Sequence, residues 1–296
     1  MLLSVNQLTK TYKEHVAVDE LTFSVKENEC VALIGPNGSG KTTTLNMLAG
    51  LLEPTSGEVA FMGKPGIDKQ KIGYLPQYPT FFSWMTAKEY LYFAGKLSHV
   101  PSKKLKSQVD DMLEFVGLQE VKNKRIRGFS GGMKQRLGIA QALLHEPKLL
   151  IFDEPVSALD PQGRRDVLQM MLQLKKKLTI VFSTHVLHDA EQICDRTIMI
   201  KNGKVKWSGS LEDLKNQQRK SNYFIAANQN LKSWLRTKPY IKDFQLCTDT
   251  SAEITLVNDN DRFQLLQDCV RDKLDVIHFE KRTHSLEDAY LEVMSQ

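Results

Sequence analysis

Short apolar runs alternate with amphipathic stretches along most of the chain. Four of the apolar runs are continuous, as in strands buried on both faces, and they occupy residues 30–34, 148–153, 178–183 and 197–200. Helices are predicted at 43–50, which ends on glycine, and at 161–177, which begins with proline. Continuous apolar strands that alternate with helices indicate an α/β fold with a parallel sheet covered on both faces. In such a sheet, ligands bind at the carboxyl ends of the strands.

Shorter elements surround the predicted sheet. Strands are expected at residues 2–8, 16–25, 59–62 and 71–77. From Thr86 the apolar period becomes helical, because Thr86 and Glu89 form a capping-box pattern ahead of an apolar face. A second helix is predicted to start at Pro101 and to end at Gly117. The sequence therefore predicts a helical insert at about residues 84–145 between two β-rich portions.

The pattern changes again after a basic segment at 214–220. The predicted order is strand 223–226, helix 231–236, strands 241–247 and 253–257, helix 262–274 and strand 276–281. This βαββαβ order is that of a small α+β, ferredoxin-like unit. A last helix is expected to open at Ser285, with Asp288 completing a second capping box. We therefore expect two domains, at residues 1–215 and 216–296.

Charge is distributed unevenly between these two portions. The net charge of the 296 residues is +5. The residues from Gln217 onward contain 11 basic and 12 acidic side chains, a net charge of −1, whereas the remainder contains 29 and 23, a net charge of +6. Basic runs at 122–125 and 175–177 supply much of this excess. Such runs are usually solvated helix faces, and attraction to an anionic membrane or a nucleic acid is the alternative.

Apolar runs and cysteines bear on the cellular setting. No apolar run approaches the ~20 residues that a membrane-spanning helix needs, and the polar residues after Val5 argue against a secretion signal. The cysteines show no CxxC spacing and are expected to be reduced core residues of a cytosolic protein; they are Cys30, Cys194, Cys247 and Cys269.

A phosphate-binding loop follows the first buried strand. The residues that fit the pattern G-x-x-x-x-G-K-[ST] are Gly35, Pro36, Asn37, Gly38, Ser39, Gly40, Lys41 and Thr42. The glycines let consecutive N–H groups face one anion at a helix N-terminus, whose dipole also favours negative charge. Lys41 can then reach the β- and γ-phosphates of a nucleotide, and the Thr42 hydroxyl can hold Mg²⁺.

Two carboxylates follow the second buried strand. The apolar run that ends at Phe152 places Asp153 and Glu154 at the carboxyl end of a strand, beside the phosphate loop. Asp153 is positioned to support hydrated Mg²⁺, and Glu154 to orient or deprotonate an attacking water. The predicted chemistry is hydrolysis of a nucleoside triphosphate.

A second candidate anion site lies at Ser130, Gly131 and Gly132, which open a helix with an apolar face. Taken alone, this pattern also fits an ordinary N-cap. Together with the phosphate loop and the two carboxylates, however, it resembles one family, the ATP-binding-cassette (ABC) ATPases. The resemblance covers about residues 2–215 and implies a P-loop NTPase (RecA-like) core with an antiparallel β subdomain and the α-helical insert.

The resemblance also implies roles that the residues alone do not give. Ser130, Gly131 and Gly132 would contact the γ-phosphate of ATP bound to the other subunit of a head-to-tail dimer. Gln77 would touch Mg²⁺ and link the site to the helical insert and to membrane partners. His185 would contact the γ-phosphate. Tyr12 would stack on adenine, and Thr43 would complete the ATP site after Thr42. The loop that crosses the dimer interface would be Ser157, Ala158, Leu159 and Asp160.

One departure from the family pattern lies beside the signature. Phe129 and Met133 stand where the commonest family form has leucine and glutamine. The phosphate-contacting Ser130 and the glycines after it are intact, and so are Glu154 and His185. We therefore expect hydrolysis of ATP with Mg²⁺ at two equivalent sites of a homodimer.

The type of ABC protein is indicated by the domain count and by the tail. One cassette without a membrane span resembles a separate ATP-binding subunit, which implies polytopic transmembrane permease partners, a place on the cytoplasmic face of a bacterial plasma membrane, and no direct nucleic-acid binding. The end of the chain, residues 285–292, looks like the tail of the ABC-2-type exporters, which move drugs, peptide antibiotics, ions, lipids or polysaccharides. The alternatives are an importer subunit and a soluble ABC ATPase that acts on ribosomes or DNA.

Overall fold

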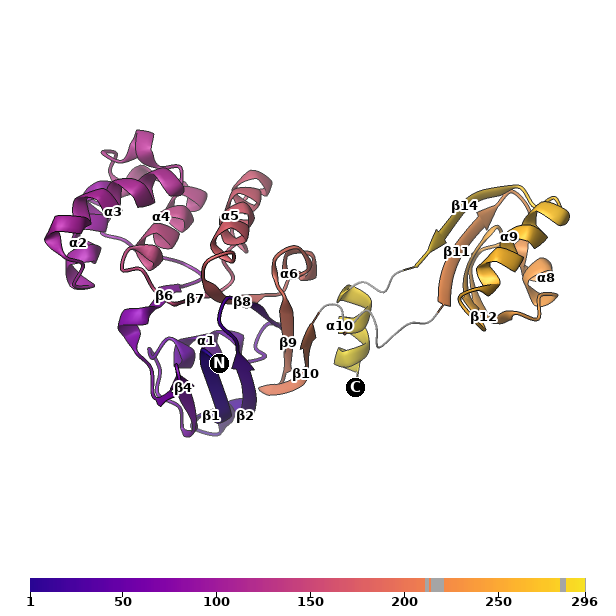
Figure 1. Ribbon diagram of the computed structural model, residues 1–296, viewed down its shortest axis with the longest axis horizontal. Helices are drawn as coiled ribbons and strands as arrows, with labels where there is room; N and C mark the ends of the chain where they lie inside the picture. The colour runs from indigo at the N-terminus through magenta and orange to yellow at the C-terminus, as the bar shows by residue number, and fades with distance from the viewer. Residues whose placement is uncertain (211–212, 214–220, 283–285, 296) are drawn as a thin grey trace. The chain divides into compact units, whose positions relative to one another are not determined.

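The computed structural model describes residues 1–210, 213, 221–282 and 286–295 (Figure 1). The chain forms two compact units, one of Met1–Leu211 with Tyr290–Gln296 and one of Glu212–Ala289. The domain boundary expected between residues 215 and 216 lies outside the described residues. The last helix was expected to belong to the tail domain, whereas its residues from Tyr290 onward group with the first unit.

A six-stranded sheet forms the centre of the first unit, in the order β10-β9-β3-β8-β7-β6. Its strands are β3 (Cys30–Ile34), β6 (Ile72–Leu75), β7 (Leu149–Phe152), β8 (Thr179–Thr184), β9 (Arg196–Lys201) and β10 (Lys204–Ser210). All neighbours pair in parallel except β10, which runs antiparallel to β9. Every residue of β3, β7 and β8 is buried, as the continuous apolar runs predict.

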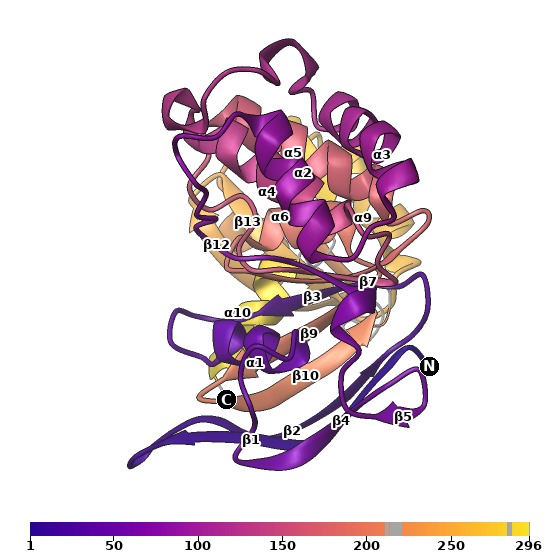
Figure 2. The ribbon, with the colours of Figure 1, turned by 90° about the vertical axis from the view of Figure 1, so that its left-hand side faces the viewer.

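An antiparallel sheet covers one face of this core. Its order is β2-β1-β4-β5, and its strands are β1 (Leu3–Tyr12), β2 (His15–Val25), β4 (Ser56–Phe61) and β5 (Lys64–Pro65). Helix α1 (Lys41–Leu48) lies between the two sheets (Figure 2). Leu45 and Leu48 of α1 share one apolar core with Leu3 and Leu8 of β1 and with Leu33 of β3. The expected antiparallel β subdomain is therefore confirmed.

The helical insert consists of α2 (Ala87–Leu97), α3 (Ser102–Phe115) and α4 (Gly131–Leu143), with short 3₁₀ turns between α3 and α4. Both hydrogen bonds of the predicted capping box between Thr86 and Glu89 are present. Helix α3 begins directly after Pro101 and ends before Gly117, whose φ of +64° no helix interior allows. The insert predicted from the change of period is therefore confirmed.

Two helices cover the other face of the six-stranded sheet. They are α5 (Pro161–Leu174) and α6 (Leu187–Ile193), which pack against each other. Val167 and Met171 of α5 and Ala190 and Ile193 of α6 are fully buried. Helix α5 was predicted from the sequence, but α6 was not. Because β3, β7 and β8 are parallel, the loops after their carboxyl ends meet at one edge of the sheet, where the candidate residues lie.

The second unit contains a four-stranded sheet with the order β12-β13-β11-β14. Its elements are β11 (Ser221–Ala227), α8 (Leu231–Arg236), β12 (Ile241–Thr248), β13 (Ser251–Leu256), α9 (Asp261–Arg271) and β14 (Val276–Lys281). All its strand pairs are antiparallel, in the βαββαβ chain order that was expected. Tyr223 stacks on Phe279 at 5.4 Å between ring centroids, and Leu265 and Cys269 of α9 complete its core.

The final helix, α10, spans Leu286–Ser295. Lys201 at the end of β9 donates a hydrogen bond from Nζ to Met294 O of this helix. The capping box expected between Ser285 and Asp288 lies outside the described residues.

Two further observations concern the cellular setting. No helix among the described residues combines the length and the apolar content needed to cross a bilayer. Cys30, Cys194 and Cys269 are buried as expected, but Cys247 is exposed on β12, so its assignment to a core was wrong. The side chains of a strand alternate between its two faces, and in β12 the apolar Phe244 and Leu246 take the inner positions.

Candidate functional site

The phosphate loop joins β3 to α1 with a backbone that favours glycine at two points. Gly38 and Gly40 have φ angles of +79° and +101°, in the left-handed region. A Cβ atom at Gly40 would also lie 2.4 Å from Ala17 O, so the loop approaches β2 too closely for any side chain. Gly203 N–H donates to Ser39 O at 3.1 Å, which ties the loop to the β9–β10 turn. Contacts with β2 and with the β9–β10 turn therefore fix the conformation of the loop.

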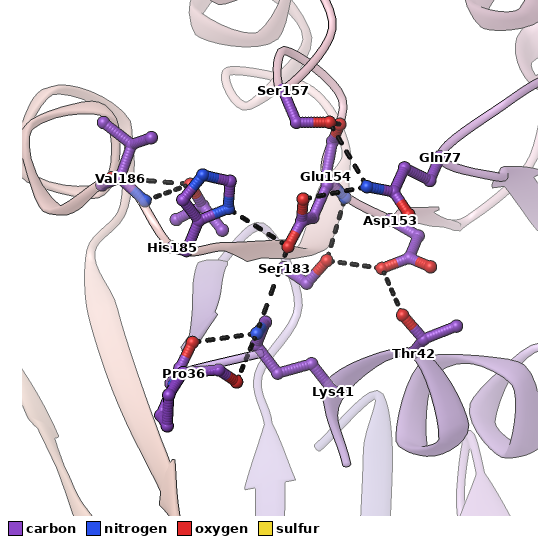
Figure 3. Close-up of polar contacts among 12 residues, drawn as sticks. Pro36, Lys41, Thr42, Gln77, Asp153, Glu154, Ser157, Ser183, His185 and Val186 are labelled. Carbon is purple, nitrogen blue, oxygen red and sulfur yellow. Dashed lines mark hydrogen bonds and ion pairs between the residues drawn. The ribbon is translucent and has the colours of Figure 1, made fainter. Parts of the chain in front are cut away.

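Lys41 extends from the start of α1 back beneath this loop. Its Nζ donates hydrogen bonds to Gly35 O at 2.8 Å and Pro36 O at 3.0 Å (Figure 3). Only 5% of the side chain is exposed, and desolvation lowers the pKa of Lys41, whereas the nearby Glu154 and Asp153 act to raise it. A buried ammonium held by carbonyl oxygens is available to phosphate oxygens that approach the loop.

Ser39 also indicates that the loop binds an anion. Its hydroxyl oxygen is buried and has no hydrogen-bond partner among the described residues, although buried hydroxyls are normally paired. A bound phosphate is a group that could satisfy it. The loop therefore fits an anion by its backbone, by Lys41 and by this unpaired hydroxyl.

Asp153 lies at the carboxyl end of β7, buried and joined to two hydroxyls. Thr42 Oγ1 donates to Asp153 Oδ1 at 3.2 Å, and Ser183 Oγ donates to the same oxygen at 2.6 Å. Clustered hydroxyl and carboxylate oxygens are the ligand type that Mg²⁺ prefers, often with phosphate oxygens completing its shell. Thr42 and Asp153 could therefore hold Mg²⁺ directly or through water. Ser183 was not predicted as a site residue, because only the pairing of β7 with β8 brings it to Asp153.

Glu154 is the centre of the polar contacts in Figure 3. Gln77 Nε2 donates to Glu154 Oε2 at 3.0 Å, His185 Nδ1 lies 3.2 Å from Oε1, and Lys41 Nζ lies 4.0 Å from Oε1. The residue has a φ of +44°, which is uncommon for a side chain other than glycine. Its N–H donates to Ser183 Oγ at 2.8 Å, so Ser183 holds both consecutive carboxylate residues in place. The structure therefore brings together all four residues that were predicted to be catalytic.

A cleft of about 490 Å³ opens above these groups. Its lining includes two predicted catalytic residues, Gln77 and Glu154, and most of the ATP-binding residues predicted within one chain, which are Tyr12, Asn37, Gly38, Gly40, Lys41, Thr42 and Thr43. Tyr12 is 46% exposed at the end of β1, so its ring is available to a flat ligand. His15 and Ala17 of β2 also line the cleft and were not predicted, because no motif marks them.

The signature residues do not line this cleft. Ser130 caps α4 by accepting a hydrogen bond from Met133 N–H at 3.2 Å, and Ser130 and Gly131 are both exposed. A Cβ atom at Gly131 would lie 3.9 Å from Ala158 O, so the signature and the 157–160 loop are neighbours within one chain. Phe129, the departure from the common pattern, is buried and therefore takes a core position instead of a ligand position.

Asp160 has a structural role within the chain. Its Oδ1 accepts a hydrogen bond from Gly163 N–H at 2.8 Å and caps α5, with Pro161 at the first helical position. Ser157 contacts the catalytic cluster, because its hydroxyl donates to Glu154 O at 3.1 Å. The loop at 157–160 therefore connects Glu154 to the start of α5.

Comparison with known proteins agrees with this geometry. The family model for ABC transporters matches residues 18–157, and the model for the C-terminal domain of DrrA1-3-like ATP-binding proteins matches residues 209–294. YxlF of Bacillus subtilis (strain 168), an uncharacterized ABC transporter ATP-binding protein, is 54% identical over 99% of both chains. The bacitracin transport ATP-binding protein BcrA of Bacillus licheniformis is 34% identical, over 99% of this chain and 97% of its own.

A solved structure of a similar cassette contains bound nucleotide. The ATP-binding cassette MJ0796, in a dimeric post-hydrolysis state with ADP and Pi bound, matches with a TM-score of 0.65 and 28% identity, over 71% of this chain and 99% of its own. The phosphate loop, the paired carboxylates and the full-length relatives lead to the same assignment. The chain belongs to the ATP-binding proteins of ABC transporters, in the group with a DrrA1-3-like C-terminal domain, and is an ABC ATPase whose ATP hydrolysis is coupled to transport.

Proposed function

We propose that this chain is the ATPase subunit of a bacterial exporter that removes antibiotic-like compounds through separate membrane permease subunits. The observation that carries the proposal is the match to the bacitracin transport protein BcrA, which extends over the second unit as well as the cassette. The match to the DrrA1-3-like C-terminal domain over residues 209–294 points to the same group. We place the chain on the cytoplasmic face of the plasma membrane, where the permease would hold it.

Two copies of the chain would form a head-to-tail dimer that holds two ATP molecules. The exposed Ser130 and Gly131 lie at the start of α4, where Ser130 caps the Met133 N–H, while the N–H groups of Gly131 and Gly132 have no carbonyl partner within the helix. Such a terminus attracts phosphate. These residues do not line the cleft of their own chain. They would therefore meet the ATP that lies in the partner's cleft, and the neighbouring 157–160 loop would lie at the same interface.

Hydrolysis would use the cluster around Glu154. Lys41 and the loop N–H groups would bind the phosphates, and Thr42, Asp153 and Gln77 would hold Mg²⁺, which neutralises charge on the phosphate oxygens. Glu154 would orient and deprotonate the attacking water, and His185, 3.2 Å from it, would contact the γ-phosphate. Gln77 hydrogen-bonds Glu154 and would thereby sense the state of the site.

A surface for the permease lies directly after Gln77. Tyr78, Phe82 and Trp84 are 68%, 40% and 64% exposed, and we name Phe82 and Trp84, whose rings contact each other, the aromatic patch. The Phe82 ring lies 5.0 Å from that of Trp84 and 5.5 Å from that of Phe93 on α2. An exposed cluster of large apolar rings is typical of a protein interaction site. A permease segment bound there would be joined to Glu154 through Gln77.

The test is affinity purification of the tagged chain from detergent-solubilised native membranes, followed by mass spectrometry. We expect a polytopic membrane protein in stoichiometric amount with the wild-type chain and with Phe263→Ala, a control at an exposed aromatic residue of the second unit. The double variant Phe82→Ala/Trp84→Ala should lose this partner but retain ATP binding. Recovery of ribosomal proteins or nucleic acid without a membrane protein would refute the transporter and favour a soluble ATPase.

Direction and substrate need a second measurement. A strain that lacks the chain should become more sensitive to bacitracin or a related peptide antibiotic, and the wild-type gene but not its Glu154→Gln variant should restore resistance. Unchanged sensitivity across a panel of antibiotics would refute this substrate class. Co-purification of an extracytoplasmic solute-binding protein would instead indicate an importer.

A further inference from the structure

An ion pair joins the first turns of the two helices that follow the candidate catalytic loops. Helix α5 is capped by Asp160, the last residue of the 157–160 loop, and Arg164 N–H donates to Asp160 O at 2.9 Å. Helix α6 begins at Leu187, directly after His185 and Val186. Arg164 and Asp189 therefore lie just behind the two segments that are expected to meet ATP.

The geometry of this pair is specific. Arg164 Nη2 and Nε donate to Asp189 Oδ1 at 2.6 Å and 3.0 Å. The Asp189 side chain is 1% exposed, whereas that of Arg164 is 34% exposed. The second oxygen, Asp189 Oδ2, is buried and has no hydrogen-bond partner among the described residues. Only one oxygen of this buried carboxylate is hydrogen-bonded, and its partner is the arginine. Loss of the arginine would leave the buried charge uncompensated, which strongly favours the paired state.

A second ion pair clamps the opposite ends of the same helices. Lys175, at the end of α5, donates from Nζ to Asp195 Oδ1 at 2.7 Å and to Ile193 O, the last residue of α6, also at 2.7 Å. The packing of α5 on α6 is thus secured at both ends. Only the Arg164–Asp189 pair lies at the end where the 157–160 loop and His185 are located. Lys175–Asp195 can therefore serve only the packing of the helices, whereas Arg164–Asp189 can also position the catalytic segments.

We propose that Arg164 and Asp189 are positioning residues for ATP hydrolysis, which hold the 157–160 loop and His185 in one fixed relation. The inference rests on the proposed roles of His185 and of that loop. Ser157 contacts Glu154 at one end of the loop and Asp160 caps α5 at the other, so a displacement of α5 would reach the catalytic carboxylate. With the pair intact, dimer contacts made by the loop and γ-phosphate contacts made by His185 form or break together.

The variants that test this are Asp189→Asn and Arg164→Lys, with Lys175→Met as the matched control on the other clamp. Steady-state ATPase assays, nucleotide titration and thermal unfolding are measured on the full chain. We expect kcat to fall roughly 10- to 100-fold in Asp189→Asn, with KM and ATP affinity unchanged, and to fall less in Arg164→Lys, which keeps the charge. The control should lower the thermal midpoint but keep kcat within about twofold of wild type.

Three results would overturn the proposal. The first is wild-type kcat in Asp189→Asn. The second is an equal loss of kcat in Lys175→Met, because the pair would then act only through general packing. The third is a change confined to KM. If Asp189→Asn does not fold, Arg164→Lys remains decisive, because its side chain is partly exposed and its loss of kcat at an unchanged melting temperature would support the proposal.

His185→Ala, assayed in parallel, separates this inference from the proposed function. A turnover defect in His185→Ala without one in Asp189→Asn would refute the positioning pair alone. Full turnover in His185→Ala would refute the role of His185 and with it the basis of the inference.

Discussion

Replacement of Glu154 by glutamine is the most direct test of the site. Glutamine has the volume of glutamate, so its amide oxygen can accept the hydrogen bond from Gln77 Nε2 that Oε2 accepts at 3.0 Å. Its amide nitrogen then faces His185 Nδ1, which lies 3.2 Å from Oε1 and can accept from it in the neutral tautomer. The substitution removes one charge and one base, ends the attraction to Lys41, and leaves the contacts with Gln77 and His185 satisfied.

The magnitude follows from these two losses. Glu154 Oε1 lies 4.0 Å from Lys41 Nζ, and two unit charges at that distance attract by about 4 kcal/mol at an effective dielectric constant of about 20. Without this competing partner, Lys41 should bind phosphate oxygens at least as well, so ATP affinity should be unchanged or higher. Loss of a general base slows turnover by roughly 100- to 10,000-fold, or about 3–5 kcal/mol in the barrier.

The assays are phosphate release, nucleotide titration and size-exclusion chromatography with ATP and Mg²⁺. The variant should bind ATP, hydrolyse it at a rate reduced by the factor above and accumulate as a dimer. Glu146→Gln, the same change at an exposed residue that takes no part in the cleft, should behave as wild type. Turnover of Glu154→Gln within about tenfold of wild type would refute the assignment of Glu154 as the base, and loss of ATP binding would refute the reasoning about Lys41.

Three further predictions concern other parts of the chain. Gly40→Ala should abolish ATP binding and lower the free energy of unfolding by at least about 1–2 kcal/mol, whereas Gly63→Ala, at a left-handed position with no atom within 4 Å, should keep ATP binding; nucleotide titration and urea unfolding check both. Ser183→Ala leaves Asp153 and Glu154 N–H without their shared partner and should slow turnover roughly tenfold at unchanged KM, a result that an effect on KM alone would contradict. In the second unit, burial opposes the charge on Asp268, but hydrogen bonds from Tyr240 and Lys238 hold its pKa below the usual aspartate value, and hydrogen bonds from Lys238 and Arg271 lower the pKa of Asp272. Because both folded-state pKa values are depressed, the stabilisation from these ionised carboxylates is complete above about pH 4 and is lost as the pH falls further. Acid should therefore reduce the hydrogen-exchange protection of residues 221–282 less in Lys238→Met than in the wild type. The same pH dependence of protection in both proteins would contradict the mechanism.

The sequence was most informative where a residue's role depends on its own neighbours in the chain. The phosphate loop and the carboxylates after β7 are of this kind, since a buried strand with polar residues at its end specifies both burial and placement. Strand β10 also has a strand pattern in its sequence, although no strand was predicted there. Val205 and Trp207 alternate with Lys204 and Lys206, and the observed burial follows this alternation.

Other features depend on contacts that are remote in sequence. Ser183 acquires its role only because β8 pairs with β7, and His15 and Ala17 reach the cleft only because β2 passes beside the phosphate loop. Helix α9 was expected to extend to residue 274 but ends at Arg271. Lys273 has a φ of +52°, which stops the helix, and nothing in its side chain signals a left-handed position.

The return of the chain to the first unit changes how the second unit should be regarded. Residues from Tyr290 onward group with the cassette, and Lys201 Nζ donates a hydrogen bond to Met294 O, so along the chain the second unit lies between two segments of the first. A single proteolytic cut between residues 212 and 220 would therefore leave it attached through α10. A chain in which a flexible linker replaces residues 212–289 should retain the fold of the cassette, because the entropic cost of closing a linker grows only slowly with its length.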